Sequence, residues 1–94
     1  MEDLRDEAEV EKRIDKIQED LRFCEKILNK EARIELAKRI LEDLLKEVRS
    51  IPRDGLSEHL KAKLTDMEMR IRILYHRANA LLSLQEERGK YNSI

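Results

Sequence analysis

Few residues of this chain have the types and spacing that catalysis or metal binding requires. The two histidines, His59 and His76, belong to no Glu-x-x-His or His-x-x-x-His pattern, which are the signatures of metal sites on helices. Cys24 is the only cysteine, so it allows neither an intramolecular disulfide nor a cysteine-based metal site. No serine lies in a Gly-x-Ser-x-Gly context, and the two glycines are too far apart to form a phosphate-binding loop. We therefore expect no enzyme activity and no cofactor.

A stripe of basic residues is the second feature with chemical potential. Lys63, Arg70 and Arg77 recur every seven residues, which places them along one side of a helix. Basic residues in such positions commonly pair with acids on an adjacent helix. The functional interpretation is a docking surface for an anionic partner. A nucleic acid is the alternative ligand for this stripe, although no aromatic platform for stacking bases accompanies it.

Two apolar residues lie on the polar side of the same segment. Met69 and Ile73 are four residues apart and face away from the apolar seam described next, and Ala62 and Ala80 flank them. Exposed apolar patches often mark contact sites. We expect Met69 and Ile73 to mediate self-association, with a two-fold homodimer as the default form, or to dock a partner.

The elements that carry these residues are predicted from apolar spacing. In three stretches, apolar residues recur at alternating intervals of three and four, a pattern that fits one face of an α-helix and does not fit a strand. The pattern predicts long amphipathic helices that pack along coiled-coil-like seams, with Cys24 as a buried packing residue. The seams are Val10, Ile14, Ile17, Leu21, Cys24 and Leu28; Ile34, Ala37, Leu41, Leu44, Val48 and Ile51; and Leu60, Leu64, Met67, Ile71, Leu74, Ala78 and Leu81.

The fold class predicted is all-α, an antiparallel three-helix bundle. Asp54 or Ser57 is expected to cap the third helix, after a loop that contains Pro52 and Gly55. Gly89 is expected to end that helix. The helices are predicted at about residues 3–28, 32–50 and 56–87 of a single domain, residues 1–88, followed by a flexible C-terminal tail, residues 89–94.

The break between the first two helices is the least marked in the sequence. Residues 29–31 contain neither glycine nor proline, yet the seam changes phase between Leu28 and Ile34. We interpret this change as a tight turn. The alternative is one continuous helix over residues 3–50, about 70 Å long, within a long helical hairpin that dimerises to bury its seam.

Composition and charge narrow the class of protein. The 94 residues include 20 basic and 21 acidic side chains, for a formal net charge of −1. This balance gives no bulk attraction to nucleic acid or to an anionic membrane. No apolar run approaches the roughly 20 residues that span a bilayer. The acidic N-terminus lacks the apolar segment of a secretory signal. We expect a cytoplasmic protein that is not bound to a membrane.

Three segments resemble a known family. Residues 10–21 (VEKRIDKIQEDL) resemble the start of the first helix of BAG domains, which are three-helix modules that bind the nucleotide-binding domain of Hsp70 chaperones. Residues 44–51 (LLKEVRSI) resemble the end of their second helix, and residues 77–82 (RANALL) are similar to part of their third. The chain departs from the family pattern at Arg49, where the family carries Asp, and at Asn79, where it carries Gln.

The resemblance implies a non-enzymatic module for protein–protein interaction, in the form of a BAG-like co-chaperone that grips an Hsp70-type partner. The charged residues expected to hold the partner are Glu42, Asp43, Glu47, Arg70, Arg72 and Arg77. Two functions from other classes stay open. One is a nucleic-acid-associated protein, and the other is a small all-helical enzyme of the chorismate-mutase type, whose Arg/Lys/Glu set has no clear counterpart in this chain.

Overall fold

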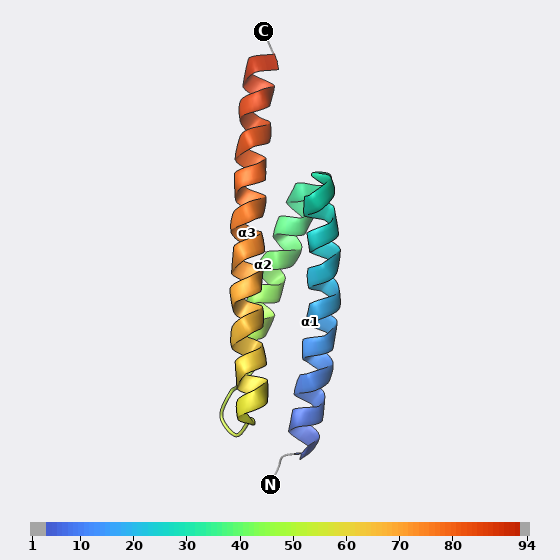
Figure 1. Ribbon diagram of the computed structural model, residues 1–94, viewed down its shortest axis with the longest axis vertical. Coiled ribbons are helices and arrows are strands. Elements are labelled where there is room, and N and C mark those ends of the chain that lie inside the picture. The colour runs from blue at the N-terminus through green and yellow to red at the C-terminus, as the bar shows by residue number, and fades with distance from the viewer. Residues whose placement is uncertain (1–3, 93–94) are drawn as a thin grey trace.

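The computed structural model describes the backbone of residues 4–92 and the side-chain environments of residues 7–89. Three α-helices follow one another along the chain, α1 over Leu4–Lys30, α2 over Ile34–Ser50 and α3 over Glu58–Asn92. α2 runs antiparallel to α1 and to α3, and every pair of helices is in contact (Figure 1). The predicted all-α three-helix bundle is therefore confirmed.

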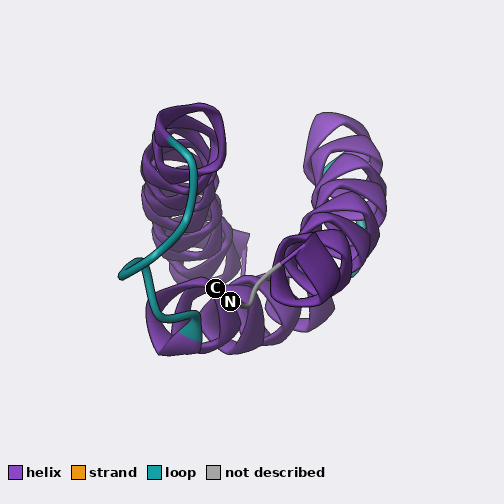
Figure 2. Ribbon diagram, turned by 90° about the horizontal axis from the view of Figure 1, so that it is seen from below, coloured by secondary structure: helices purple, strands orange, loops and turns teal. Residues whose placement is uncertain are grey.

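α2 is the shortest helix and lies between the other two. It has 17 residues, against 27 in α1 and 35 in α3. Seen along the bundle axis, α1 and α3 flank α2 (Figure 2). The bundle measures 66 × 17 × 16 Å, because α3 extends well beyond the turn that joins α1 to α2 (Figure 1).

The core is made of the predicted seams. Every buried residue in the described part of the chain is apolar. All residues of the three seams are buried except Leu81, which is half-buried, and the core also includes Ile27. Full burial of a Val, Leu, Ile or Met side chain stabilises the folded state by about 1.5–3 kcal/mol. The continuous row of such residues along α2 therefore holds the three helices together.

The turn between α1 and α2 is tight and contains no glycine. The Glu31 amide donates a hydrogen bond to the Leu28 carbonyl (3.1 Å), and the Ala32 amide donates to the Ile27 carbonyl (3.3 Å). These two bonds form a Schellman motif, with Glu31 in the left-handed position at φ 53°. The continuous-helix alternative over residues 3–50 is therefore wrong, because the chain reverses direction at this turn.

Both predicted helix boundaries around this turn lie two residues too early in the chain. α1 continues to Lys30 rather than ending at residue 28, and α2 begins at Ile34 rather than at residue 32. The residue before α2, Arg33, is also left-handed (φ 55°), and its side chain makes no capping hydrogen bond. Left-handed backbone costs a non-glycine residue about 1–2 kcal/mol. Burial of the flanking Leu28 and Ile34 offsets this cost.

The connection from α2 to α3 follows the predicted signals. Gly55 has φ 83°, which suits a glycine in a turn. The Ser57 hydroxyl accepts a hydrogen bond from the Leu60 amide (3.3 Å), so Ser57 is the cap of α3. The Ser57 amide donates to the Glu7 carboxylate (2.8 Å), which joins the start of α1 to the start of α3.

The predicted end of the third helix at Gly89 is wrong. α3 continues through Gly89 to Asn92, and Gly89 does not adopt the positive φ of a helix-ending glycine. A glycine inside a helix costs only about 1 kcal/mol relative to alanine. All residues from Ser83 to Gly89 are exposed, so α3 projects into solvent as a helix. Residues 93 and 94, the rest of the predicted tail, lie outside the described residues.

Substitution of Glu31 by glycine should stabilise the bundle. Glycine adopts the left-handed conformation at little cost, so Glu31→Gly is expected to raise the free energy of unfolding by about 1 kcal/mol in a urea titration. The matched control is Glu19→Gly, at an exposed position inside α1, which should lower the free energy of unfolding by roughly 0.5–1 kcal/mol. Equal destabilisation by both variants would show that residue 31 is not left-handed.

Cys24 should react slowly with thiol reagents. Its side chain is fully buried, and its Sγ lies 3.8 Å from the carbonyl oxygen of Ala37. Burial raises the pKa of the Cys24 thiol to about 11, and the charge of Asp20 adds to the increase. Since only the thiolate attacks, this pKa alone lowers the labelling rate at neutral pH by about 100-fold relative to an unperturbed thiol. An Ellman assay in buffer and in denaturant measures the ratio.

The control for this assay carries Cys24→Ser and Ser83→Cys, which moves the thiol to an exposed position on α3. Its labelling rate should be similar in buffer and in denaturant. Native labelling of the unmodified chain at the denatured rate would contradict the burial of Cys24.

Candidate protein-binding surfaces

The side of the bundle where α2 lies against α3 carries polar contacts between these two helices, Arg49 with Glu68 and Glu42 with Tyr75. We call this side the α2–α3 face. Its charged and half-buried residues come from matching turns of the two helices, and loop residue Arg53 closes its lower end. The residues that define the face are Lys38, Glu42, Leu45 and Arg49 of α2, and Glu68, Arg72, Tyr75 and Leu82 of α3.

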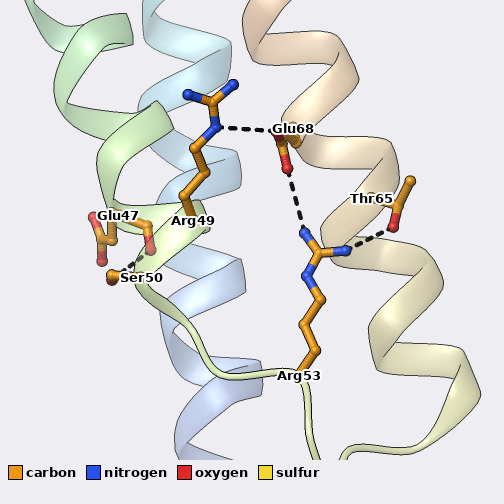
Figure 3. Close-up of polar contacts among 6 residues, drawn as sticks. All are labelled: Glu47, Arg49, Ser50, Arg53, Thr65 and Glu68. Atoms are coloured by element: carbon orange, nitrogen blue, oxygen red, sulfur yellow. Dashed lines mark hydrogen bonds and ion pairs between the residues drawn. The ribbon is translucent and has the colours of Figure 1, made fainter.

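Glu68 organises the lower part of the α2–α3 face (Figure 3). The Arg49 Nε donates to Glu68 Oε2 at 3.1 Å, and the Arg53 Nη2 donates to Glu68 Oε1 at 3.4 Å. The Arg53 Nη1 also donates to the Thr65 hydroxyl at 2.8 Å. One carboxylate therefore ties both the end of α2 and the following loop to α3. An exposed pair of this kind contributes about 0.2–1 kcal/mol, so its main effect is to fix the side chains of this region.

Tyr75 organises the upper part of the face. Its hydroxyl donates a hydrogen bond to Glu42 Oε2 (3.1 Å). The Lys38 ammonium lies 5.9 Å from the centre of the Tyr75 ring, within the range of a cation–π contact. The ring is half-buried and its edge approaches the neighbouring His76. A tyrosine with one apolar side and a polar tip is a common anchor at protein interfaces.

Two surface depressions follow the α2–α3 face and share Glu42. The lower one, about 430 Å³, lies around Tyr75. The upper one, about 550 Å³, lies where α3 leaves α2 behind. Both are open to solvent and carry charges of both signs. The lower depression is lined by Glu42, Leu45, Lys46, Arg49 and Tyr75, and the upper one by Glu35, Lys38, Arg39, Glu42, Leu82, Gln85 and Glu86.

Two of the predicted partner-binding residues lie on the α2–α3 face. Glu42 contacts Tyr75 and lines both depressions. Arg72 is exposed and lies four residues after Glu68 and three before Tyr75, which places it on the same side of α3. The neighbouring Asp43 is also exposed.

The other predicted partner-binding residues lie toward α1. Glu47 forms an ion pair with Arg13 of α1, with 3.8 Å between Oε2 and Nε. Arg77 donates a hydrogen bond to the side chain of Asn29, also in α1, at 2.9 Å. Arg70 is exposed and lies seven residues before Arg77, on the same side of α3. The structure therefore divides the predicted set between two sides of the bundle.

Six residues of the α2–α3 face were not predicted as functional. They are Lys38, Leu45, Arg49, Glu68, Tyr75 and Leu82, and all of them except Arg49 are half-buried beside the seams. Their signal in the sequence is weak, because a residue next to a seam is usually at the edge of the core. Tyr75 was the most accessible clue, since it is one of two tyrosines and follows the seam residue Leu74.

The predicted self-association residues lie on the solvent side of α3. Met69 is 56% exposed and Ile73 is 60% exposed. Leu84, which is 47% exposed, follows Ile73 by eleven residues and so lies on the same side three turns later. Ala62 and Ala80 are also exposed. We call Met69, Ile73 and Leu84 the outer patch of α3.

The described part of the chain contains no group of three or more His, Cys, Asp or Glu side chains that is arranged to hold a metal ion. Within the same residues, no helix has the length and apolar character needed to cross a membrane. No family model matches the chain, and no characterised protein or solved structure matches it either. The function is therefore inferred from the surfaces of the bundle.

Proposed function

We propose that the chain is a non-enzymatic protein–protein interaction module and that its partner binds the α2–α3 face. The observation that carries this proposal is the pair of depressions along that face, which share Glu42 and of which the upper one is also lined by Gln85 and Glu86 of the projecting part of α3. The face combines Tyr75 and Arg49 with the apolar Leu45 and Leu82. Tyrosine and arginine are enriched at protein interfaces, where they bury a large area and still form directed hydrogen bonds.

The distribution of polar groups supports an interaction module over an enzyme. Polar groups stabilise a transition state most strongly in a site that excludes water. In the described residues the buried interior is entirely apolar, and the contacts of Glu42 and Tyr75 lie at the surface. A surface of this kind suits a partner that covers it and removes the water itself.

The projecting part of α3 extends the proposed binding surface. Ser83–Gly89 are all exposed. Leu82, Gln85 and Glu86 from this region form one wall of the upper depression, and α2 forms the other. A partner that binds there contacts both α2 and α3, so the interface is larger than the one that the bundle offers without the projecting part.

The specific form of the proposal is a BAG-like co-chaperone that binds the nucleotide-binding domain of an Hsp70-type chaperone. The resemblance in sequence and the three-helix architecture support this form. Arg49, at the position where the family carries Asp, forms an ion pair with Glu68. On this proposal Glu42 and Arg72 are the charged residues that grip the partner on the α2–α3 face.

The test measures binding of a purified Hsp70 nucleotide-binding domain by calorimetry. Exchange of both charges, with Glu42→Arg and Arg72→Glu, keeps the net charge and should weaken binding by more than about tenfold, because each reversal places like charges together at the interface. The matched control is Glu19→Arg with Arg22→Glu, a charge exchange at exposed positions of α1. The control should bind like the unmodified chain.

Three outcomes would count against parts of this proposal. If the Hsp70 domain does not bind, the BAG-like form is wrong. If the two double variants capture the same proteins in the same amounts from a lysate, the α2–α3 face is not the binding surface. If the chain binds a polyanion column at low salt and elutes at moderate salt, the nucleic-acid alternative is favoured, because phosphate contacts weaken steeply with salt.

We also propose that the chain self-associates through the outer patch of α3. Burial of an exposed Met or Ile side chain is worth roughly 1.5–3 kcal/mol, and Met69 and Ile73 are both more than half exposed in the single chain. The double variant Met69→Lys, Ile73→Lys should shift sedimentation equilibrium to the monomer and leave the helical circular dichroism unchanged. The control Met69→Leu, Ile73→Leu keeps the apolar surface and should still associate. A strict monomer at millimolar concentration of the unmodified chain would reject self-association.

A further inference from the structure

A second depression with different chemistry lies beside the turn between α1 and α2. It has a volume of about 250 Å³. We call it the Phe23 pocket. Three of its lining residues are apolar and three are basic, none is acidic, and the surface that they present to the pocket is mostly apolar. The residues that line it are Phe23, Ile27 and Ala32, with Lys26, Lys30 and Arg33 around them.

The apolar half of the pocket is built by the Schellman turn. The hydrogen bond from the Ala32 amide to the Ile27 carbonyl (3.3 Å) holds these two residues next to each other. An apolar contact between these two positions commonly accompanies the motif. Ile27 is 9% exposed and forms the edge of the core, whereas Phe23, one turn earlier in α1, is 49% exposed. The turn therefore fixes the floor of the pocket, and Phe23 presents an uncovered aromatic ring beside it.

The three basic residues come from α1 and from the turn before α2. Lys26 and Lys30 are four residues apart in α1, and Arg33 is the residue that precedes α2. No ion pair joins any of the three to an acid in the described part of the chain. Lys30 is in the last turn of α1, where a cation also stabilises the helix dipole. That effect gives Lys30 a structural role, whereas the ion pairs of the described residues involve neither Lys26 nor Arg33.

We propose that the Phe23 pocket binds an acidic segment of a partner protein that inserts an apolar side chain beside Phe23. Three cations lie together in a chain whose net charge is −1, so the charge at this site is complementary to an acidic ligand. A volume of about 250 Å³ is below the range of small-molecule sites, about 300–1,000 Å³, and suits one large side chain. The pocket is concave, which favours an inserted side chain over a membrane surface.

This inference goes beyond the proposed function, because the Phe23 pocket and the α2–α3 face have no lining residue in common. Loss of binding at one surface therefore does not imply loss at the other.

The test uses the full chain and a blocked synthetic peptide that carries one Phe and one Leu among glutamates. Two-dimensional amide NMR should show peptide-dependent shifts at Phe23, Ile27 and Ala32. The double variant Lys26→Glu, Lys30→Glu should weaken binding by about tenfold or more, because two attractive pairs become repulsive. The matched control is Lys12→Glu, Lys16→Glu, which has the same spacing in α1, exposed positions and the same change in charge.

Two further arms separate the components of the site. Phe23→Ala keeps the cations and should weaken the peptide by about tenfold through loss of the apolar contact, while a peptide with alanines in place of Phe and Leu should bind the unmodified chain equally weakly. The proposal is overturned if both peptides bind equally, if the Lys12/Lys16 control loses as much affinity as the Lys26/Lys30 variant, or if the shifts lie elsewhere. Binding to phosphatidylserine vesicles that depends on Phe23, without binding of the peptide, would show a membrane site instead.

Discussion

The bundle depends on the burial of one apolar stripe of α2 between the other two helices. α2 has 17 residues, and an isolated helix of about this length has little stability in water. Packing against both neighbours provides the stability that the backbone hydrogen bonds of α2 do not provide alone. Ala37 and Leu41 of α2 are fully buried. Because α2 is shorter than its neighbours, its two ends set the points beyond which the other helices are not packed against it. At its lower end Glu7 and Ser57 link α1 directly to α3.

The same constraint locates the candidate binding surfaces. At the start of α2 the chain reverses direction, and α3 extends beyond this point. The reversal forms the Phe23 pocket on the α1 side, whereas the projecting part of α3 forms the upper depression on the α2–α3 face. Both surfaces therefore follow from a mismatch in helix length, in a molecule whose described part buries no polar or charged residue. In a small bundle with a fully apolar core, the polar and charged side chains lie on the surface, where partners bind.

The sequence predicted the core well because burial is encoded by spacing. Residues at intervals of three and four share a face whatever the neighbours are, so the seams could be listed before the fold was known. The predicted binding set was harder, because periodicity gives the face of a helix and does not say which neighbour lies on each flank. Glu42 and Glu47 therefore lie toward different helices, although both border the seam of α2. Gly89 was misjudged because a glycine ends a helix only where the backbone turns left-handed, and the sequence does not show that.

Photo-crosslinking in cells tests the central claim, that a partner protein covers the α2–α3 face, most directly. One chain carries benzoylphenylalanine in place of Arg72, on that face, and a second carries it in place of Asp15, at an exposed position of α1. The account predicts that irradiation links the residue-72 chain to a defined partner protein and leaves the residue-15 chain free of that product. The same product from both chains, or a product from residue 15 alone, would contradict it.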